Sequence, residues 1–357
     1  MYSPQDNVTA PLYVITSIFN SARFKSRYKL YRDFAAYVKQ SGAILVTIEA
    51  AFGDRTYALE QHANVGPPHD GHHKSFGPAP NPPSASLPHS REGQDYIKVR
   101  ADQMQEIWLK ENLQNIAVQH LPEEAKYIAF IDADVRFARP DWVSETLHSL
   151  QHYDVTQMFS TAIDLSPDYE PLMLHRSFGY SYLNGETGPD DGYSNYGSKA
   201  NVAIWHPGFA WAWKKSALDA VGGLIDWGVT GSNDHHMSKC LIGKGQDSYD
   251  TRVSPAYKAA VLEWQARAIG ALQKNIGYVE GTLHHYWHGR KIARGYKSRW
   301  QILVESQYDP KKDIIRDWRG LYKLTGNKPK LRDDLRAYFK SRDEDDVFCP
   351  DEDHTLL

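Results

Sequence analysis

The first part of the chain alternates short apolar runs with a stretch of helical periodicity. Residues 12–19 and 43–49 are rich in β-branched and aromatic side chains, so each run predicts a strand. Between them, apolar residues recur at helical spacing among Lys and Arg, at Phe24, Tyr28, Tyr31, Ala35 and Val38. This order predicts a βαβ unit, whose right-handed crossover places the carboxyl ends of both strands at one edge of a parallel sheet.

The run from Tyr127 to Ile131 has no polar alternation, which is typical of a strand covered on both faces in a parallel sheet. Two carboxylates, Asp132 and Asp134, follow at the carboxyl end of this strand, where open α/β sheets place their ligands. Residues two apart on a continuing strand point the same way, so both carboxylates can face one crevice. Such a pair favours a hard divalent cation that can also bind a diphosphate, although the pair can alternatively cap the following helix or turn.

The remaining chain predicts further strands and helices and one long loop. Strands are expected at residues 96–100, 155–162, 206–213 and the start of 278–288, and helices at 104–113, from 141, from 233, and at 256–272, 298–307, 311–323 and 330–341. Asn233 is expected to cap its helix, which places Asp234 in the first turn. Residues 164–207 carry little periodicity and predict a loop whose aromatic side chains suit stacking on flat ligands or local packing, namely Tyr180, Tyr182, Tyr193, Tyr196 and Trp205.

These elements predict an α/β fold over residues 1–255, with a mostly parallel sheet flanked by helices. A mainly helical, basic region is expected at residues 256–342, and an acidic disordered tail at 343–357. Residues 66–91 contain seven prolines and almost no large apolar side chains, so they predict a mobile surface insertion.

Composition and cysteine content indicate a soluble protein of a reducing compartment. The 357 residues are 41% apolar and 24% charged, which suits one large or two modest domains. The two cysteines, Cys240 and Cys349, are too few for a disulfide framework, and the sequence contains no signal segment and no apolar run long enough to span a membrane. We therefore expect a cytoplasmic protein without membrane association, and nothing in the sequence indicates an obligate protein partner.

Charge is distributed unevenly along the chain, although the net charge is only -3. Residues 289–342 contain sixteen Lys or Arg against six Asp or Glu, whereas residues 343–357 contain seven acids and no Lys or Arg. One interpretation is a helical surface with many ion pairs followed by a solvated acidic tail. The other is a face that binds a polyanion, either the diphosphate of a sugar nucleotide or a nucleic acid.

Three segments in this order resemble glycosyltransferases of the GT-A fold, of the broad family-two-like kind: Val14–Asn20, Asp132–Asp134 and Ala220–Asp226. The resemblance covers roughly residues 12–290, excluding the Pro-rich insertion. It looks closest to phage and bacterial glycosyltransferase-like proteins, on the segments Ile131–Trp142 and Tyr286–Gly289. It implies a GT-A domain, a helical C-terminal extension and a nucleoside-diphosphate sugar as donor, with a UDP-sugar as the expected kind.

The resemblance also implies roles for individual residues around the donor. Asp132 and Asp134 match the motif that holds the divalent metal and the ribose-diphosphate. The other donor-binding residues that it implies are Thr16, Asn20, Arg23, Glu49, Lys110 and Asn112. Glu49 replaces the usual Asp that contacts the nucleobase or ribose, and Lys110-Glu-Asn112 replaces Ala-Arg-Asn, so the sequence departs from the family pattern at both places.

Asp234 occupies the place of the carboxylate that acts as catalytic base in inverting relatives. A carboxylate suits that role because the acceptor hydroxyl must lose a proton as it attacks the anomeric carbon, although Asp234 can instead only cap its helix. His285 and His288 resemble the C-terminal histidine that completes metal coordination, and an imidazole beside carboxylates suits Mn²⁺ somewhat better than Mg²⁺. Contacts to the acceptor are expected from Trp205, His206, His235 and His236.

The sequence therefore predicts a metal-dependent glycosyltransferase. A hydroxymethylated pyrimidine in DNA is the favoured acceptor, because residues 289–342 mix cations with aromatic side chains and because some phage genomes carry glycosylated hydroxymethyl pyrimidines. This acceptor would place the protein in a bacterial or phage-infected cytoplasm. The alternatives are a glycan or protein glycosyltransferase, a non-catalytic protein that binds carbohydrate or nucleic acid, and a metal-dependent nucleotidyltransferase.

Overall fold

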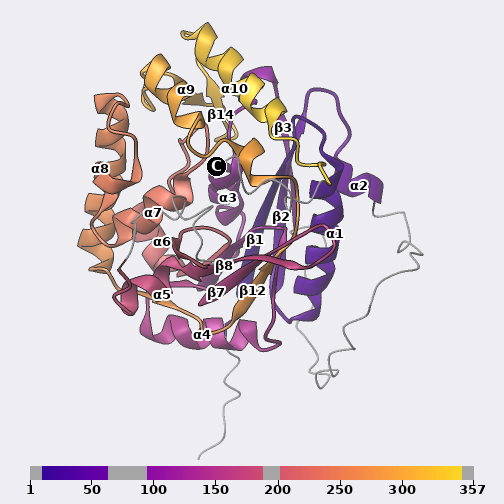
Figure 1. The fold of residues 1–357 in the computed structure, drawn as a ribbon, viewed down its shortest axis with the longest axis vertical. Helices are drawn as coiled ribbons and strands as arrows, with labels where there is room; N and C mark the ends of the chain where they lie inside the picture. The colour runs from indigo at the N-terminus through magenta and orange to yellow at the C-terminus, as the bar shows by residue number, and fades with distance from the viewer. Residues whose placement is uncertain (1–9, 63–94, 188–201, 348–357) are drawn as a thin grey trace, which may run out of the picture.

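The computed structural model describes residues 10–62, 95–187 and 202–347, and its centre is a seven-stranded sheet (Figure 1). The strand order is β11-β6-β10-β4-β1-β2-β3. All neighbouring strands in this sheet are parallel except the two pairs that involve β10. The strands are β1 Leu12–Phe19, β2 Ile44–Phe52, β3 Tyr96–Ala101, β4 Tyr127–Ile131, β6 Val155–Gln157, β10 Ala210–Lys214 and β11 Ile276–Tyr278.

Both faces of the sheet are covered, as the apolar runs of the sequence predict. Side chains of β1 alternate between two core clusters, with Tyr13 and Ile15 in one and Leu12 and Val14 in the other. Helices α1 (Lys25–Gln40) and α4 (Trp142–His152) cover the second face. The first face is covered by α3 Lys110–Val118, α6 Lys215–Val221, α7 Asn233–Leu241 and α8 Pro255–Leu272. The α/β fold expected for a GT-A domain, with a mostly parallel sheet flanked by helices, is confirmed.

A second sheet of five strands carries part of the candidate site. Its order is β5-β12-β7-β8-β9, and its strands are β5 Val135–Phe137, β7 Thr161–Leu165, β8 Pro171–Ser177, β9 Val202–His206 and β12 Thr282–His285. Strand β12 comes from far along the chain, yet it pairs with β5, which begins directly after Asp134. The peptide N–H of Tyr286 continues this pairing by donating to the carbonyl of Asp134 at 2.8 Å. The pairing therefore carries the segment after β12 to the end of β4.

Two local predictions were wrong. The loop expected at residues 164–207 contains β8, the helix α5 (Phe178–Leu183) and β9, although Tyr193 and Tyr196 lie outside the described residues. The helix expected at 311–323 is a hairpin of β13 (Ile314–Arg316) and β14 (Tyr322–Leu324). Its turn forms because the carboxylate of Asp317 accepts the peptide N–H groups of Arg319 and Leu321, which offers the backbone an alternative to a helix.

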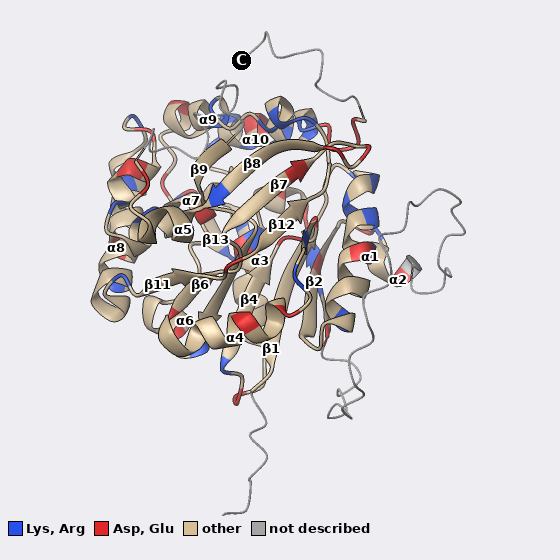
Figure 2. Cartoon of the chain, turned by 60° about the horizontal axis from the view of Figure 1, so that its bottom comes forward, with Lys and Arg blue, Asp and Glu red and all other residues tan. Residues whose placement is uncertain are grey.

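The basic region from residue 289 is built into the fold rather than attached to it. Strands β11 and β12, which lie beyond the expected domain boundary at residue 255, complete the two sheets. Helices α9 (Arg299–Ser306) and α10 (Pro329–Ser341) follow the prediction, and Figure 2 shows basic and acidic residues interspersed along them. Several of these cations form ion pairs at the surface, among them Lys330 with Glu305 and Asp334. Much of the local positive charge is thus neutralised by neighbours.

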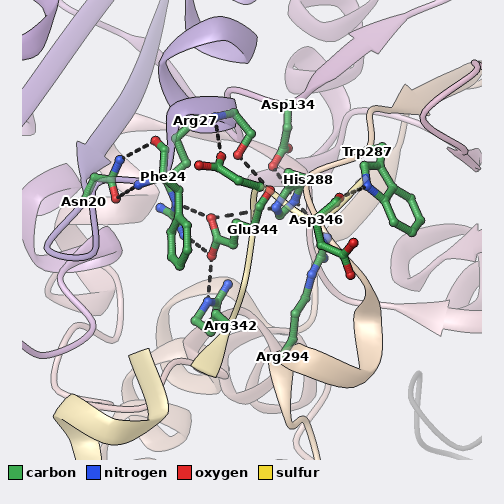
Figure 3. Close-up of polar contacts among 12 residues, drawn as sticks. Asn20, Phe24, Arg27, Asp134, Trp287, His288, Arg294, Arg342, Glu344 and Asp346 are labelled. Carbon is green, nitrogen blue, oxygen red and sulfur yellow. Dashed lines mark hydrogen bonds and ion pairs between the residues drawn. The ribbon is translucent and has the colours of Figure 1, made fainter. Parts of the chain in front are cut away.

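Residues 343–347 form a strap that crosses from the basic region to α1 (Figure 3). The carboxylate of Glu344, which is 1% exposed, pairs with Arg27 and Arg342. Asp345 accepts the first peptide N–H groups of α1, from Lys25 and Ser26, at 2.9 and 2.8 Å. Asp346 pairs with Arg290 at 2.6 Å.

The expected disordered tail is therefore wrong for residues 343–347, because their acidic side chains find cations and a helix N-terminus. Residues 348–357 of that tail, like the Pro-rich insertion at 66–91, lie outside the described residues. Within the described ranges, no helix combines the length and the apolar character needed to cross a membrane.

We expect Glu344→Gln to lower the free energy of unfolding by about 3–5 kcal/mol, because it leaves buried Arg342 and half-buried Arg27 without their carboxylate. Burial acts to raise the pKa of Glu344, but Arg27 and Arg342 hold it well below the usual range. The difference from the wild type should therefore be constant near neutral pH and shrink as the pH falls below about 4.3, the unfolded value.

Urea denaturation at several pH values measures this difference. Asp333→Asn, which removes an exposed partner of Arg332, is the matched control and should leave the midpoint unchanged. Equal effects of the two substitutions at pH 7 would show that the Glu344 pairs do not stabilise the strap.

Candidate functional site

A cavity of about 170 Å³ lies at the carboxyl ends of β1 and β4. Its floor includes Thr16 to Phe19 from β1 and Asp132 to Asp134 after β4. Nine charged side chains line the walls: five cations, Arg27, Lys110, Arg294, Arg299 and Arg342, and four carboxylates, Asp132, Asp134, Asp234 and Glu344. The cavity therefore lies where parallel sheets bind ligands, and its charges suit an anionic ligand with a cation.

The two carboxylates after β4 both line this cavity but have different partners. The ammonium group of Lys110 forms an ion pair with Asp132. Burial acts to lower the pKa of Lys110, but the nearby carboxylates of Asp132, Glu111 and Asp234 raise it above the usual value, so Lys110 stays charged. Asp134 instead faces two imidazoles, those of His285 and His288. The structure thus separates the two acidic residues of the motif, and only Asp134 joins the histidines.

Asp134, His285 and His288 form a triangle of ligand atoms. Asp134 Oδ2 lies 3.0 Å from His288 Nε2 and 3.9 Å from His285 Nε2, and the two Nε2 atoms are 3.3 Å apart. A point equidistant from these three atoms is about 2.0 Å from each, close to the ~2.0–2.2 Å of metal bonds to imidazole and carboxylate. Of the described residues, these three form the group whose acidic and imidazole ligand atoms converge closely enough for a metal ion.

Hydrogen bonds around the triangle leave its nitrogen atoms as acceptors. His285 Nδ1 lies 2.7 Å from the carboxylate of Asp164, so Nδ1 carries the proton and Nε2 keeps its lone pair. His288 Nε2 lies 3.0 Å from the guanidinium of Arg294, which can only donate. Burial and Arg294 lower the pKa of His288 to about 4, so this imidazole is neutral at pH 7. Two imidazole lone pairs therefore face one carboxylate.

The carboxylate of Asp134 is held in its charged form. Burial acts to raise the pKa of Asp134, but it lies below the usual value, and the permanently charged Arg294 is among the groups that lower it. Its second oxygen, Oδ1, is buried and has no hydrogen-bond partner. Buried acceptors are normally paired, so an unpaired carboxylate oxygen beside two imidazole lone pairs fits a site for a divalent cation.

Asp234 lies in the first turn of α7, as the sequence predicts, and lines the same cavity. The chain enters α7 through Ser232 with a φ of 71°. Gly208 lies next to Asp234 and leaves room for its carboxylate, because a Cβ on residue 208 would lie only 3.0 Å from Asp234 Oδ2. Asp234 is also close enough to raise the pKa of Lys110.

Other expected donor-binding residues are divided between this cavity and a neighbouring hollow. Thr16 lines the cavity. Arg23 lines an open hollow of about 520 Å³, together with Arg55 and Glu106, near the carboxyl ends of β2 and β3. The side chain of Asn20 is hydrogen-bonded to the backbone of Phe24 at both ends.

Glu49 and Asn112 have structural partners instead of facing the cavity. The Glu49 carboxylate accepts the peptide N–H groups of Ala58 and Leu59 and the hydroxyl of Tyr96. The Asn112 side chain is 1% exposed and bonds to the backbone of the β13–β14 hairpin and to Asp226.

The residues expected on the acceptor side also differ in position. His206 lines the cavity and stacks on Phe209 with ring centroids 4.2 Å apart. His236 is buried between the hydroxyls of Ser248 and Tyr257, at 2.7 Å from each. Trp205 and His235 are buried and do not line the cavity.

Six residues at or beside the cavity were not expected from the sequence. They are its four arginines, Arg27, Arg294, Arg299 and Arg342, and the carboxylates Asp164 and Glu344. The excess of Lys and Arg in residues 289–342 was a signal for three of the arginines, but it did not show which would turn inward. Asp164 and Glu344 carried no local signal, because they reach the site through long-range pairing.

Comparison with known proteins finds similarity in structure alone. No protein-family model matches the chain, and no curated protein sequence matches it. Among solved structures, the catalytic domain of Drosophila β1,4-galactosyltransferase 7 is 10% identical, with a TM-score of 0.29 over 67% of this chain and 62% of that one. A protein from Desulfovibrio desulfuricans described as a nucleotide-diphospho-sugar transferase is 9% identical, with a TM-score of 0.31 over 93% and 96%.

A third solved structure, 4-diphosphocytidyl-2C-methyl-D-erythritol synthase from Anaerococcus prevotii, is 10% identical, with a TM-score of 0.34 over 76% of this chain and 87% of that one. The activities in these names belong to those proteins, so the function of this chain must be inferred from its own cavity. The fold and the cavity define an α/β protein with a mostly parallel sheet, a candidate metal triangle and a carboxylate nearby.

Because Asp134 joins the histidines whereas Asp132 pairs with Lys110, we expect Asp134→Asn to weaken Mn²⁺ binding more than Asp132→Asn. Asp134→Asn should weaken Mn²⁺ affinity by more than the ~10- to 100-fold that follows the loss of a residue hydrogen-bonded to a metal ligand. Asp132→Asn should weaken it by less than about 10-fold. Titration of Mn²⁺ followed by the electron paramagnetic resonance signal of the free ion gives both dissociation constants. A larger loss in Asp132→Asn would contradict this division.

Proposed function

We propose that the protein transfers a sugar from a nucleoside-diphosphate sugar to an acceptor hydroxyl, with a divalent metal, Mn²⁺ or Mg²⁺, as cofactor. The observation that carries this proposal is the convergence of Asp134, His285 and His288 in a cavity that Asp234 also lines. When bound at this triangle, a divalent ion would neutralise charge on the departing diphosphate. The arginines that line the cavity would bind the same anion.

Arg294 has a specific part in this proposal. In the structure its guanidinium lies 3.0 Å from His288 Nε2 and 3.2 Å from the hydroxyl of Tyr296, and its Nε is buried without a partner. A diphosphate oxygen would give this guanidinium a charged acceptor in place of the imidazole lone pair. His288 Nε2 would then be available to a cation.

Asp234 is proposed as the general base. As the acceptor oxygen forms its bond to the anomeric carbon, the bond between that carbon and the diphosphate oxygen breaks, and the acceptor proton passes to Asp234. The products are the glycosylated acceptor and a nucleoside diphosphate. Burial raises the pKa of Asp132 above its usual value, although the ion pair with Lys110 acts to lower it.

The size of the cavity bears on how a donor is held. A volume of about 170 Å³ is below the ~300–1,000 Å³ of ordinary small-molecule sites, so it suits the sugar and diphosphate but not the nucleoside. The hollow of about 520 Å³ that includes Arg23 lies at the same edge of the sheet. We propose that the nucleoside of the donor, for which a UDP-sugar is the expected kind, extends toward this hollow past Thr16.

The test is turnover of a panel of nucleoside-diphosphate sugars with and without Mn²⁺, measured as release of the nucleoside diphosphate. We expect metal-dependent release from at least one donor and no pyrophosphate from nucleoside triphosphates. With an acceptor hydroxyl present, Asp234→Asn should lower kcat by about 10²- to 10⁴-fold and change the KM for the donor little, because it removes a base and no donor contact. Asp219→Asn, on the exposed surface of α6, is the matched control. Wild-type kcat in Asp234→Asn would exclude it as the base.

For the acceptor, we propose a 5-hydroxymethylpyrimidine in DNA. Support comes from the tip of the β13–β14 hairpin, where Trp318 is 90% exposed and Arg319 lies over its ring, with the centroid at 5.3 Å. Exposed Arg316, Lys311 and Lys312 lie on the same segment. An aromatic face with cations suits nucleobases and a phosphate backbone. Tyr308 and Tyr338 of the same region are buried and take no part.

We expect labelled sugar to pass to DNA that contains 5-hydroxymethylcytosine or 5-hydroxymethyluracil and not to unmodified DNA. Trp318→Ala should raise the KM for this DNA. It should leave hydrolysis of the donor in the absence of DNA unchanged, because the Trp318 side chain is exposed to solvent. Binding should weaken as salt rises. Label that appears only on glycan acceptors, or DNA binding indifferent to salt, would exclude this acceptor.

A further inference from the structure

The buried carboxylate of Asp164 contacts three nitrogen donors, one of which belongs to His285 of the metal triangle. Its Oδ1 accepts from His285 Nδ1 at 2.7 Å, and its Oδ2 contacts His175 Nε2 and the ammonium group of Lys291. Asp164 is 2% exposed and His175 is fully buried. Asp164 is not among the residues expected from the sequence at the candidate site, and it does not line the cavity.

Strand pairing fixes Asp164 beside His285. In the parallel pair of β7 and β12, Asp164 lies opposite His285, so their side chains share one face of the second sheet. In the antiparallel pair of β7 and β8, His175 lies opposite Ala162, two residues from Asp164, and so shares that face as well. The carboxylate therefore meets both imidazoles through backbone register, which leaves little freedom to the His285 ring.

Asp164 is paired on both of its oxygens. Its Oδ2 meets the ammonium group of Lys291, and its Oδ1 accepts from His285 Nδ1. An ionised carboxylate that accepts from Nδ1–H favours the imidazole tautomer with a free lone pair on Nε2. That lone pair points to the triangle, at 3.9 Å from Asp134 Oδ2 and 3.3 Å from His288 Nε2.

We propose that Asp164 is the positioning residue of the metal site, and that it holds His285 in the tautomer and orientation needed to bind a divalent ion through Nε2. This inference rests on the proposed function, because it assigns a role within the same metal site. Carboxylates behind metal-binding histidines fix the ring and raise the basicity of the ligand nitrogen. His288 has a weaker counterpart: its Nδ1 lies 3.9 Å from Glu344 Oε2, beyond hydrogen-bond distance.

The test compares Mn²⁺ binding by the wild type and by Asp164→Asn, with Mn²⁺ as the sole added ligand. Free Mn²⁺ is followed by electron paramagnetic resonance, and coordinated imidazoles are counted from nitrogen couplings of the bound ion in frozen samples. We expect two imidazoles in the wild type. Asp164→Asn should bind about 10- to 100-fold more weakly and show fewer than two imidazoles.

Asp168→Asn is the matched control, because it makes the same change four residues along at an exposed position. It should bind Mn²⁺ as the wild type does. Asp164→Asn leaves Lys291 without its buried carboxylate, so circular dichroism must show that the variant is folded. The double variant Asp164→Asn/Lys291→Met removes both charges together, avoids an uncompensated buried cation and should show the same loss of affinity.

A folded Asp164→Asn or double variant that binds Mn²⁺ with wild-type affinity through two imidazoles would overturn the role of Asp164 and leave the metal site standing. A wild type that binds no Mn²⁺ would overturn the metal site itself. The two failures are therefore distinguishable in one experiment.

Discussion

The candidate site depends on the pairing of β12 between β5 and β7. This short strand brings His285 opposite both Val135, which follows Asp134 directly, and Asp164. The candidate metal ligand His285, the neighbouring Asp134 and the carboxylate of Asp164 thus come from three separate segments of the sequence. Backbone pairing fixes such an arrangement more tightly than flexible side chains on loops would, which suits a site that must hold ligand atoms within a fraction of an ångström.

Charge balance is the second constraint on this region. Five cations and four carboxylates line a cavity of about 170 Å³, and such a group is stable only if each charge meets a partner. Lys110 pairs with Asp132, and Arg27 and Arg342 pair with Glu344. The strap that carries Glu344 passes close to Gly289, where φ is 86° and a Cβ would lie 2.5 Å from the carbonyl oxygen of Asp343. Asp134 meets the imidazoles of His285 and His288 in the same network.

The sequence predicted the parallel sheet and the position of Asp132, Asp134 and Asp234 because those features follow from local periodicity. Apolar runs without alternation mark covered strands, and polar residues after them mark the ligand-binding edge. The hairpin at residues 314–324 and strands β8 and β9 were missed, because turn chemistry at Asp317 and long-range pairing decided them. His285 and His288 were found only through a resemblance, and Asp164 and Glu344 were not found, because no local pattern records which distant strand or strap a residue will meet.

The central claim is that Asp134, His285 and His288 bind one divalent ion that also contacts the donor diphosphate. Anomalous diffraction from crystals grown with Mn²⁺ and a nucleoside diphosphate tests it most directly. We expect a single Mn²⁺ peak at about 2.0–2.3 Å from the Asp134 carboxylate and from Nε2 of both histidines, with a diphosphate oxygen among its ligands. A Mn²⁺ peak held by Asp132 and Asp134 without either histidine, or no peak in the cavity, would contradict it.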